Sequence, residues 1–184
     1  AFSGDFPFDY PSNWGGTGLW ETPTARVMED GDIRLGYAWS DPFGWYALNM
    51  GVFPGLEVGV RVIELYGIEG EYFSDLKSRT VDFKYQLLPE SRYFPALAIG
   101  AHDAVGATAF PAEYLVLSRQ LFPLDLSLGI GHRRLGGDQD LPLLGEDFGL
   151  FGGVELALTD RISLAAEYNP MECIQTNIMG GQNV

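Results

Sequence analysis

Hydrophobic and polar side chains alternate along most of this chain with a period of two residues. The segment 32–40 is the clearest case, because every second residue is large and apolar while the others are small or charged. Its large apolar positions are Ile33, Leu35, Tyr37 and Trp39. Successive side chains of a strand point to opposite faces, so the pattern predicts a β-strand with one apolar face. The Asp30-Gly31 pair favours a tight turn, and we expect a hairpin whose first strand precedes it.

The same alternation recurs in later segments, which are separated by turns rich in Gly, Pro and Asp. The further predicted strands cover residues 46–52, 56–62, 81–87, 96–101, 112–120, 124–130, 148–158 and 162–168. We count roughly ten strands, whose alternating ranges are about 6–11 residues long, and we compare them with the length of about 9–11 residues that a tilted membrane strand requires.

The connections between these strands alternate between short and long. The short ones fall at Asp30, Pro54, Pro89, Pro123 and Asp160, the longer ones fall near Gly70, Asp103 and Asp138, and the connection at residues 40–44 is intermediate. An up-and-down meander would place the two sets at opposite ends, as in outer-membrane barrels. We therefore expect an all-β fold, an antiparallel up-and-down meander that forms a transmembrane β-barrel, alone or as part of a larger one. The barrel domain would cover residues 14–170, between an irregular arm at 1–13 and an irregular tail at 171–184.

A family resemblance starts from the stretch GGTGLWETPTARVMEDGDIRLGYAWSDP, residues 15–42, and continues through residues 78–84, 112–116 and 151–155. These segments resemble the YjbH/GfcD family of outer-membrane β-barrel proteins linked to exopolysaccharide production. Members of that family are several times longer, so the chain is similar to an N-terminal portion of them. The resemblance implies a non-enzymatic role in exopolysaccharide production or export. It also implies the outer membrane of a Gram-negative bacterium, with membrane lipid, exopolysaccharide and periplasmic or outer-membrane assembly proteins as partners.

Composition narrows the function classes. The formal net charge is −14 and the isoelectric point is about 4.3, which argues against nucleic acid as a partner because binding phosphates needs a basic surface. The single cysteine, Cys173, excludes an intrachain disulfide. The loop 136–140 lacks the later glutamate of an EF-hand, so we expect no metal site, and no sequence feature predicts a cofactor.

Two sets of candidate site residues follow if the apolar faces meet lipid. The first set alternates with the apolar residues and would face the lumen, where its charges pair across a narrow interior. These lumen-facing candidates are Arg34, Glu57, Arg61, Asp82, Lys84, Asp125, Glu155 and Glu167. The second set belongs to repeated Phe-Pro pairs at strand starts, where aromatic rings favour the lipid headgroup level. These girdle candidates are Phe53, Phe94 and Phe122.

Two alternatives remain open from the sequence. In a soluble β-barrel that binds a small apolar ligand, the faces would be inverted and Leu35, Val58, Phe83 and Leu126 would point inward. An outer-membrane enzyme acting on lipid or glycan could use His102 or His132. The sequence contains no Gly-x-Ser-x-Gly elbow, HExxH motif or phosphate-binding loop, so we expect no enzymatic activity.

Overall fold

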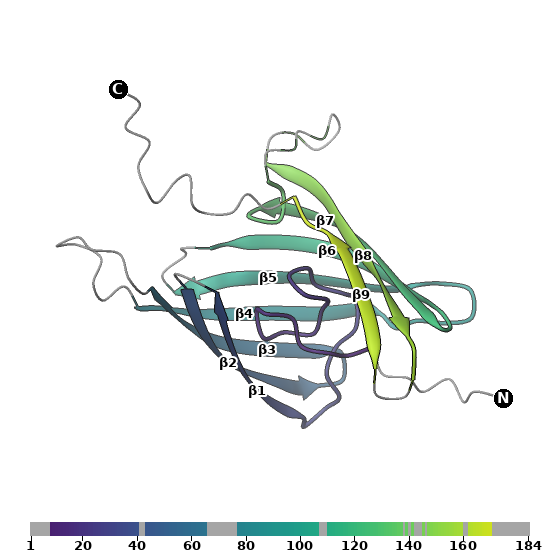
Figure 1. Ribbon diagram of the computed structural model, residues 1–184, viewed down its shortest axis with the longest axis horizontal. Helices are drawn as coiled ribbons and strands as arrows, with labels where there is room; N and C mark the ends of the chain where they lie inside the picture. The colour runs from purple at the N-terminus through teal and green to yellow at the C-terminus, as the bar shows by residue number, and fades with distance from the viewer. Residues whose placement is uncertain are drawn as a thin grey trace.

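The computed structural model describes residues 8–40, 43–65, 77–106, 110–137, 147–159 and 162–170, together with Gln139, Leu141 and Gly145. Within this part of the chain, nine strands form one antiparallel sheet in chain order (Figure 1). The strands are β1 (Ile33–Ser40), β2 (Phe43–Phe53), β3 (Leu56–Leu65), β4 (Lys77–Leu88), β5 (Ala96–Gly106), β6 (Ala112–Leu121), β7 (Leu124–Arg133), β8 (Phe148–Ala157) and β9 (Ser163–Tyr168). The predicted all-β antiparallel meander is confirmed.

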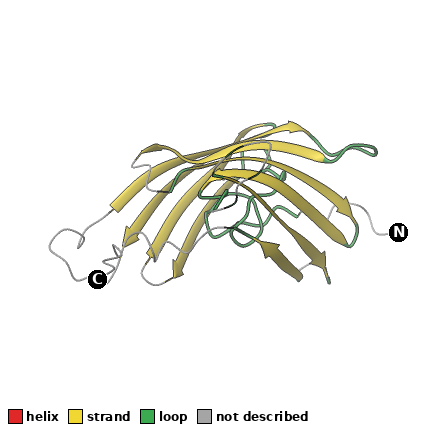
Figure 2. Cartoon of the chain, turned by 90° about the horizontal axis from the view of Figure 1, so that it is seen from above, coloured by secondary structure: helices red, strands yellow, loops and turns green. Residues whose placement is uncertain are grey.

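The sheet is curved into an arch and is not closed into a barrel. Figure 2 shows the arch from above, with the irregular N-terminal segment on its concave side. Among the described residues, β1 pairs only with β2 and β9 only with β8. The prediction of a closed barrel of roughly ten strands is therefore wrong for the described residues. In a meander of nine strands β1 and β9 run in the same direction, so these two edges cannot close an antiparallel ladder.

The strand expected before Asp30 is also absent from the structure. Residues 8–32, which we call the plug, form only isolated bridges such as that between Pro11 and Thr17, and they lie across the concave side of the sheet. The turn at Asp30-Gly31 exists, with Gly31 at a φ of 86°, but it leads from the plug into β1. The predicted tail 171–184, including Cys173, and residues 1–7 of the predicted arm lie outside the described residues.

The two faces of the sheet have opposite character. In β6 the concave-facing Tyr114 and Val116 are buried, whereas the convex-facing Leu115 and Leu117 are each 42% exposed. In β1 the convex-facing Leu35 is 80% exposed. The period-two alternation therefore gives the predicted faces, with the large apolar side chains on the outside of the arch.

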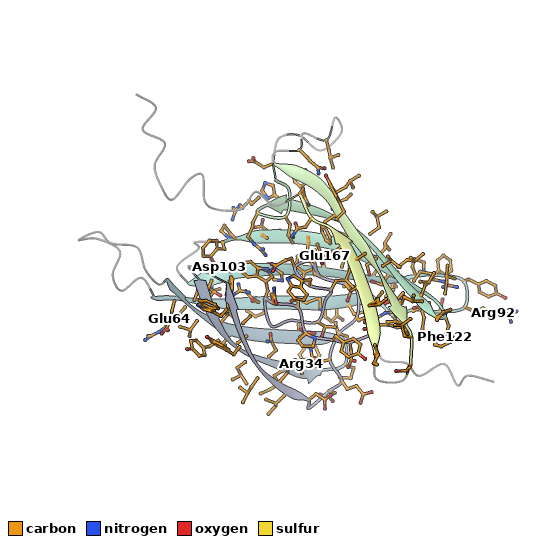
Figure 3. All side chains as sticks on the ribbon, in the orientation of Figure 1. Arg34, Glu64, Arg92, Asp103, Phe122 and Glu167 are labelled. Atoms are coloured by element: carbon orange, nitrogen blue, oxygen red, sulfur yellow. The ribbon has the colours of Figure 1, made fainter. Side chains whose placement is uncertain are left out.

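The two ends of the sheet also differ. The longest connections, residues 66–76 and 134–147, follow β3 and β7 at one end, which we call the long-loop end. Of the three connections of two residues, 54–55 and 122–123 lie at the other end, the short-turn end, and 41–42 lies at the long-loop end. In Figure 3 Glu64 and Asp103 lie at the long-loop end, and Arg92 and Phe122 lie at the short-turn end.

Small side chains let the plug approach the middle of the sheet. Ala96 and Ala98 of β5 and Ala112 of β6 are fully buried and belong to one apolar cluster with Ala25 of the plug. The remaining members of this cluster are Tyr114, Val116, Leu135 and Phe151. The described residues include no helix that is long and apolar enough to span a membrane.

Candidate functional site

The candidate site is the concave face of the sheet, where polar side chains lie beneath the plug. All eight residues predicted to face the lumen lie on this face. Six of them are at most 8% exposed although they are charged, and Arg34 and Glu167 are partly buried. Charged groups are buried at a high cost unless they are paired, so their partners explain the site.

Glu57 of β3 holds the first part of the plug. Its Oε1 accepts a hydrogen bond of 2.7 Å from the backbone N–H of Thr17, and its Oε2 accepts one of 2.8 Å from the Thr17 hydroxyl. The backbone N–H of Met28 donates to Oε2 at 3.2 Å. On the neighbouring strand, Lys84 Nζ donates to the Thr17 carbonyl at 2.6 Å and lies 3.5 Å from Glu57 Oε2. Buried backbone groups of the plug are thus satisfied by strand side chains.

Trp14 anchors the plug near the long-loop end. The guanidinium carbons of Arg61 and Arg134 lie 4.6 and 3.7 Å from the centroid of the Trp14 ring. Arg61 also donates to the Trp14 carbonyl at 3.1 Å and forms an ion pair of 2.9 Å with Asp82. Asp82 in turn accepts a hydrogen bond of 2.7 Å from the backbone N–H of Asp103. Cation–π contacts strengthen when they are desolvated, so this cluster fixes the plug firmly.

The guanidinium of Arg134, which follows β7, is buried close to another positive charge. Burial, together with the nearby Arg61 guanidinium, lowers the pKa of Arg134 to about 9. Its Nη2 lies 2.8 Å from His102 Nδ1, so the imidazole offers a lone pair to the guanidinium. The Trp14 ring and this imidazole offset part of the cost of burying the charge.

A second group of contacts holds the end of the plug that leads into β1. Arg26 donates to both carboxylate oxygens of Asp125, at 2.6 and 3.1 Å, and lies 2.6 Å from Glu90. Burial acts to lower the pKa of Arg26, but its hydrogen bonds and charge contacts with Asp125 and Glu90 raise it above the ordinary value. The backbone N–H of Ala25 donates to the Ser118 hydroxyl at 2.8 Å.

The plug also binds both edge strands. Arg34 of β1 donates to the Asp9 carbonyl at 2.6 Å, and Glu167 of β9 accepts a hydrogen bond of 2.9 Å from the backbone N–H of Glu21. Glu167 also accepts hydrogen bonds from the backbone N–H and the hydroxyl of Thr22. Figure 3 labels Arg34 and Glu167 on these two strands. The plug therefore links the two edge strands of the sheet, β1 and β9.

Little space remains between the plug and the sheet. A cavity of about 20 Å³ lies among Thr17, Asn49, Glu57, Lys84 and His102, which is room for about one water molecule. In the part of the chain that the structure describes, no group of three or more His, Cys, Asp or Glu side chains is placed to hold a metal ion. The chemistry of this face is binding of the plug through paired charges.

The other predicted residues lie away from the plug. Phe53, Phe94 and Phe122 are 49%, 67% and 45% exposed at the short-turn end, and their membrane role stays a prediction. His102 faces the concave side, whereas His132 lies on the convex side beside Glu113, at 3.1 Å. The structure therefore does not bring the two histidines together.

Sequence reasoning missed the plug residues that complete the site, mainly Trp14, Thr17 and Arg26. One signal was available, because the eight lumen-facing candidates comprise five carboxylates and three cations. That excess of acid indicates a cation from outside the predicted strands, and Arg26 supplies it. No comparable signal points to Trp14 or Thr17.

Comparisons with known proteins identify the family of this chain. The family model described as "Exopolysaccharide biosynthesis protein YbjH" matches residues 11–176. The chain is 37% identical over 131 residues to "Uncharacterized lipoprotein YjbH" of Escherichia coli (strain K12), which covers 68% of this chain and 19% of that protein. The chain thus spans about a fifth of the length of that relative. No solved structure matches. On the family match, the chain belongs to the YjbH family of exopolysaccharide biosynthesis proteins.

Proposed function

We propose that this chain forms a plugged segment of an outer-membrane β-barrel that takes part, without catalysis, in exopolysaccharide production or export. The convex face meets membrane lipid, and the concave face is filled by the plug. The family supports the link to exopolysaccharide, and the two faces of the sheet support the membrane location.

The observation that carries the membrane proposal is the exposure of large apolar side chains on the convex face of every strand. Leu35 of β1, Leu128 of β7 and Leu164 of β9 are 80%, 60% and 58% exposed, although they lie far apart on the sheet. An apolar surface that continues over all nine strands far exceeds the patches that monomeric soluble proteins expose. Membrane lipid provides an apolar environment for such a surface, while the polar side chains find their partners on the concave side.

The open edges support a place within a larger barrel. Since β1 and β9 run in the same direction, an antiparallel closure needs an odd number of further strands between them. The curated relative is about five times longer than the region matched, so a family member has length enough to supply them. Closure of the barrel pairs the backbone N–H and C=O groups of both edge strands, which lipid cannot hydrogen-bond.

The plug supports a role without catalysis. Most of the charged side chains beneath it pair with an opposite charge or bind plug backbone, and His102 and His132 lie on opposite faces. We expect a His132→Gln variant to sustain exopolysaccharide production at the wild-type level in a strain deleted for the gene. A loss of production with normal protein abundance would favour the enzymatic alternative.

Site-directed spin labelling in reconstituted bilayers tests the membrane proposal. Labels at Leu35, Leu128 and Leu164 should be accessible to oxygen and shielded from a water-soluble nickel quencher. A label at Tyr93, which is 77% exposed in the turn before β5, should respond to the quencher and serve as the control. If the quencher reaches the three leucine positions as readily as Tyr93, the convex face does not meet lipid.

The soluble alternative does not match the observed faces. It requires Leu35, Phe83 and Leu126 to line an interior, whereas they are 80%, 38% and 39% exposed on the convex side. The interior of the arch contains the plug and its polar partners instead. The cavity of about 20 Å³ beneath the plug is too small for an apolar ligand.

A further inference from the structure

A hollow of about 590 Å³ lies on the convex face, across the middle of the sheet. It extends from β4 to β8, and nearly all of its lining is apolar. The main lining side chains are Phe83, Tyr85, Ile99, Ala101, Leu115 and Ile130. Its volume falls within the range of about 300–1,000 Å³ of small-molecule sites.

The hollow exists because one side chain in this surface is small. Ala101 of β5 stands between its ladder partners Phe83 of β4 and Glu113 of β6. The larger side chains rise on both sides of the alanine, so the floor is formed by Ala101 and the backbone beside it. A larger residue at position 101 would fill the hollow without touching the buried face.

The width of the hollow indicates what it holds. Adjacent strands lie about 4.8 Å apart, so five strands span about 19 Å. An extended acyl chain is much narrower than this width, so the hollow admits more than one chain side by side. The shape therefore favours a lipid with more than one acyl chain.

A charged corner borders the hollow at the long-loop end. Glu113 Oε1 lies 3.3 Å from Arg133 Nη1, and Glu113 Oε2 lies 3.1 Å from His132 Nδ1. The His132 ring stacks on Phe148 with centroids 4.5 Å apart. Arg133 is half exposed and has a φ of 57°, which is uncommon for a residue other than glycine. A guanidinium has five N–H donors, so Arg133 can bind a phosphate while it keeps its contact with Glu113.

We propose that this hollow binds a phosphorylated glycolipid with more than one acyl chain, whose phosphate contacts Arg133. The apolar floor takes the acyl chains, and the cation at the corner selects an anionic headgroup. The inference rests on the proposed membrane location. In that location the long-loop end faces the outer leaflet, which is the glycolipid side of the outer membrane.

Native mass spectrometry of the protein extracted from outer membranes into detergent tests this site. The probes are purified lipid A and, in a parallel titration, phosphatidylethanolamine. Wild-type protein should retain lipid A at least about tenfold more tightly than phosphatidylethanolamine. Ala101→Phe should weaken lipid A binding by at least about tenfold, and Leu117→Phe, on the same face outside the hollow, is the matched control.

Arg133→Gln separates the headgroup from the acyl chains. It should remove the preference for lipid A over phosphatidylethanolamine, while Arg92→Gln at the short-turn end leaves that preference unchanged. Equal effects of Ala101→Phe and Leu117→Phe, or an unchanged preference in Arg133→Gln, would overturn the lipid site. Spin labels at Leu35 and Leu128 of the same protein in reconstituted bilayers report whether the convex face meets lipid at all, so failure of the membrane proposal is recognised separately.

Discussion

Glu57 and Thr17 are 40 residues apart in the sequence, yet both carboxylate oxygens of Glu57 bind Thr17, one through the backbone and one through the hydroxyl. Glu57 is 3% exposed and Thr17 is 1% exposed. Glu57 therefore takes the place of water as the hydrogen-bond acceptor for the Thr17 backbone N–H, which belongs to no strand. Contacts of this kind, rather than a ladder, determine where the plug lies.

We predict that Glu57→Gln destabilises the protein strongly. The amide keeps the shape but removes the negative charge beside Lys84 Nζ, which is almost fully buried. Leaving one member of a buried pair uncompensated costs about 3–5 kcal/mol of unfolding free energy. Urea unfolding of the reconstituted protein, followed by tryptophan fluorescence, measures the change.

The matched control for this substitution is Glu113→Gln on the convex side. Glu113 is 47% exposed and pairs with Arg133, so its loss should cost only about 0–1 kcal/mol. Equal losses in the two variants would mean that the buried carboxylate is not what holds the plug.

The faces of the sheet could be predicted from the sequence because a strand has a period of two. Alternation alone places Leu35 and Leu128 on one face and Glu57 and Asp125 on the other, but it does not decide which face lies on the outside of the arch. The face on which a strand residue lies follows from the residues next to it in the sequence, so a single sequence is enough to assign it.

The plug could not be predicted by the same reasoning. Thr17 and Thr22 of the plug are bound by Glu57 and Glu167, which are distant in the sequence. The local alternation of apolar and polar residues does not indicate contacts between such distant residues. The Asp30-Gly31 turn signal was genuine, but a turn does not specify a strand on both of its sides. The prediction of a closed barrel was wrong for a related reason. The alternation of apolar and polar residues within a strand does not show which strand pairs with it, so it does not show whether β1 and β9 pair with each other.

Gly129 of β7 should not tolerate a side chain. A Cβ at this position would lie 2.2 Å from Phe151 Cζ of β8, a ring that is 1% exposed. We predict that Gly129→Ala lowers the unfolding free energy by about 1–3 kcal/mol, as overpacking does. Gly36→Ala is the control, since its Cβ would meet only Ala47 Cβ at 3.8 Å. If both variants unfold at the same urea concentration, the ring of Phe151 moves aside freely.

Trp14 should contribute more to stability than any exposed tryptophan. It is 5% exposed and packs against Arg61, Arg134 and Phe110. We predict that Trp14→Ala costs about 3–5 kcal/mol, measured by urea unfolding with far-ultraviolet circular dichroism. Trp20, which is 68% exposed in the same plug, is the control, and Trp20→Ala should change stability by less than about 0.5 kcal/mol. A Trp14→Ala variant as stable as the control would show that the cation–π cluster contributes nothing.

Glu167 should protect the edge strand β9 through the plug. Its carboxylate accepts hydrogen bonds from the backbone N–H groups of Glu21 and Thr22, and β9 otherwise pairs only with β8 among the described residues. We predict that Glu167→Gln, which weakens charge-assisted hydrogen bonds, speeds amide hydrogen exchange in residues 163–168 by about tenfold or more.

Exchange in the central strands β5 and β6 should stay unchanged, because their ladder partners are intact on both sides. Glu29→Gln is the control, since Glu29 is an exposed carboxylate near the end of the plug. Faster exchange over the whole sheet would mean that Glu167 supports the global fold. Unchanged exchange in β9 would mean that the contact between plug and edge does not hold this strand. Only a local effect, confined to β9 and the plug residues it binds, agrees with a plug that links the two edge strands of the sheet.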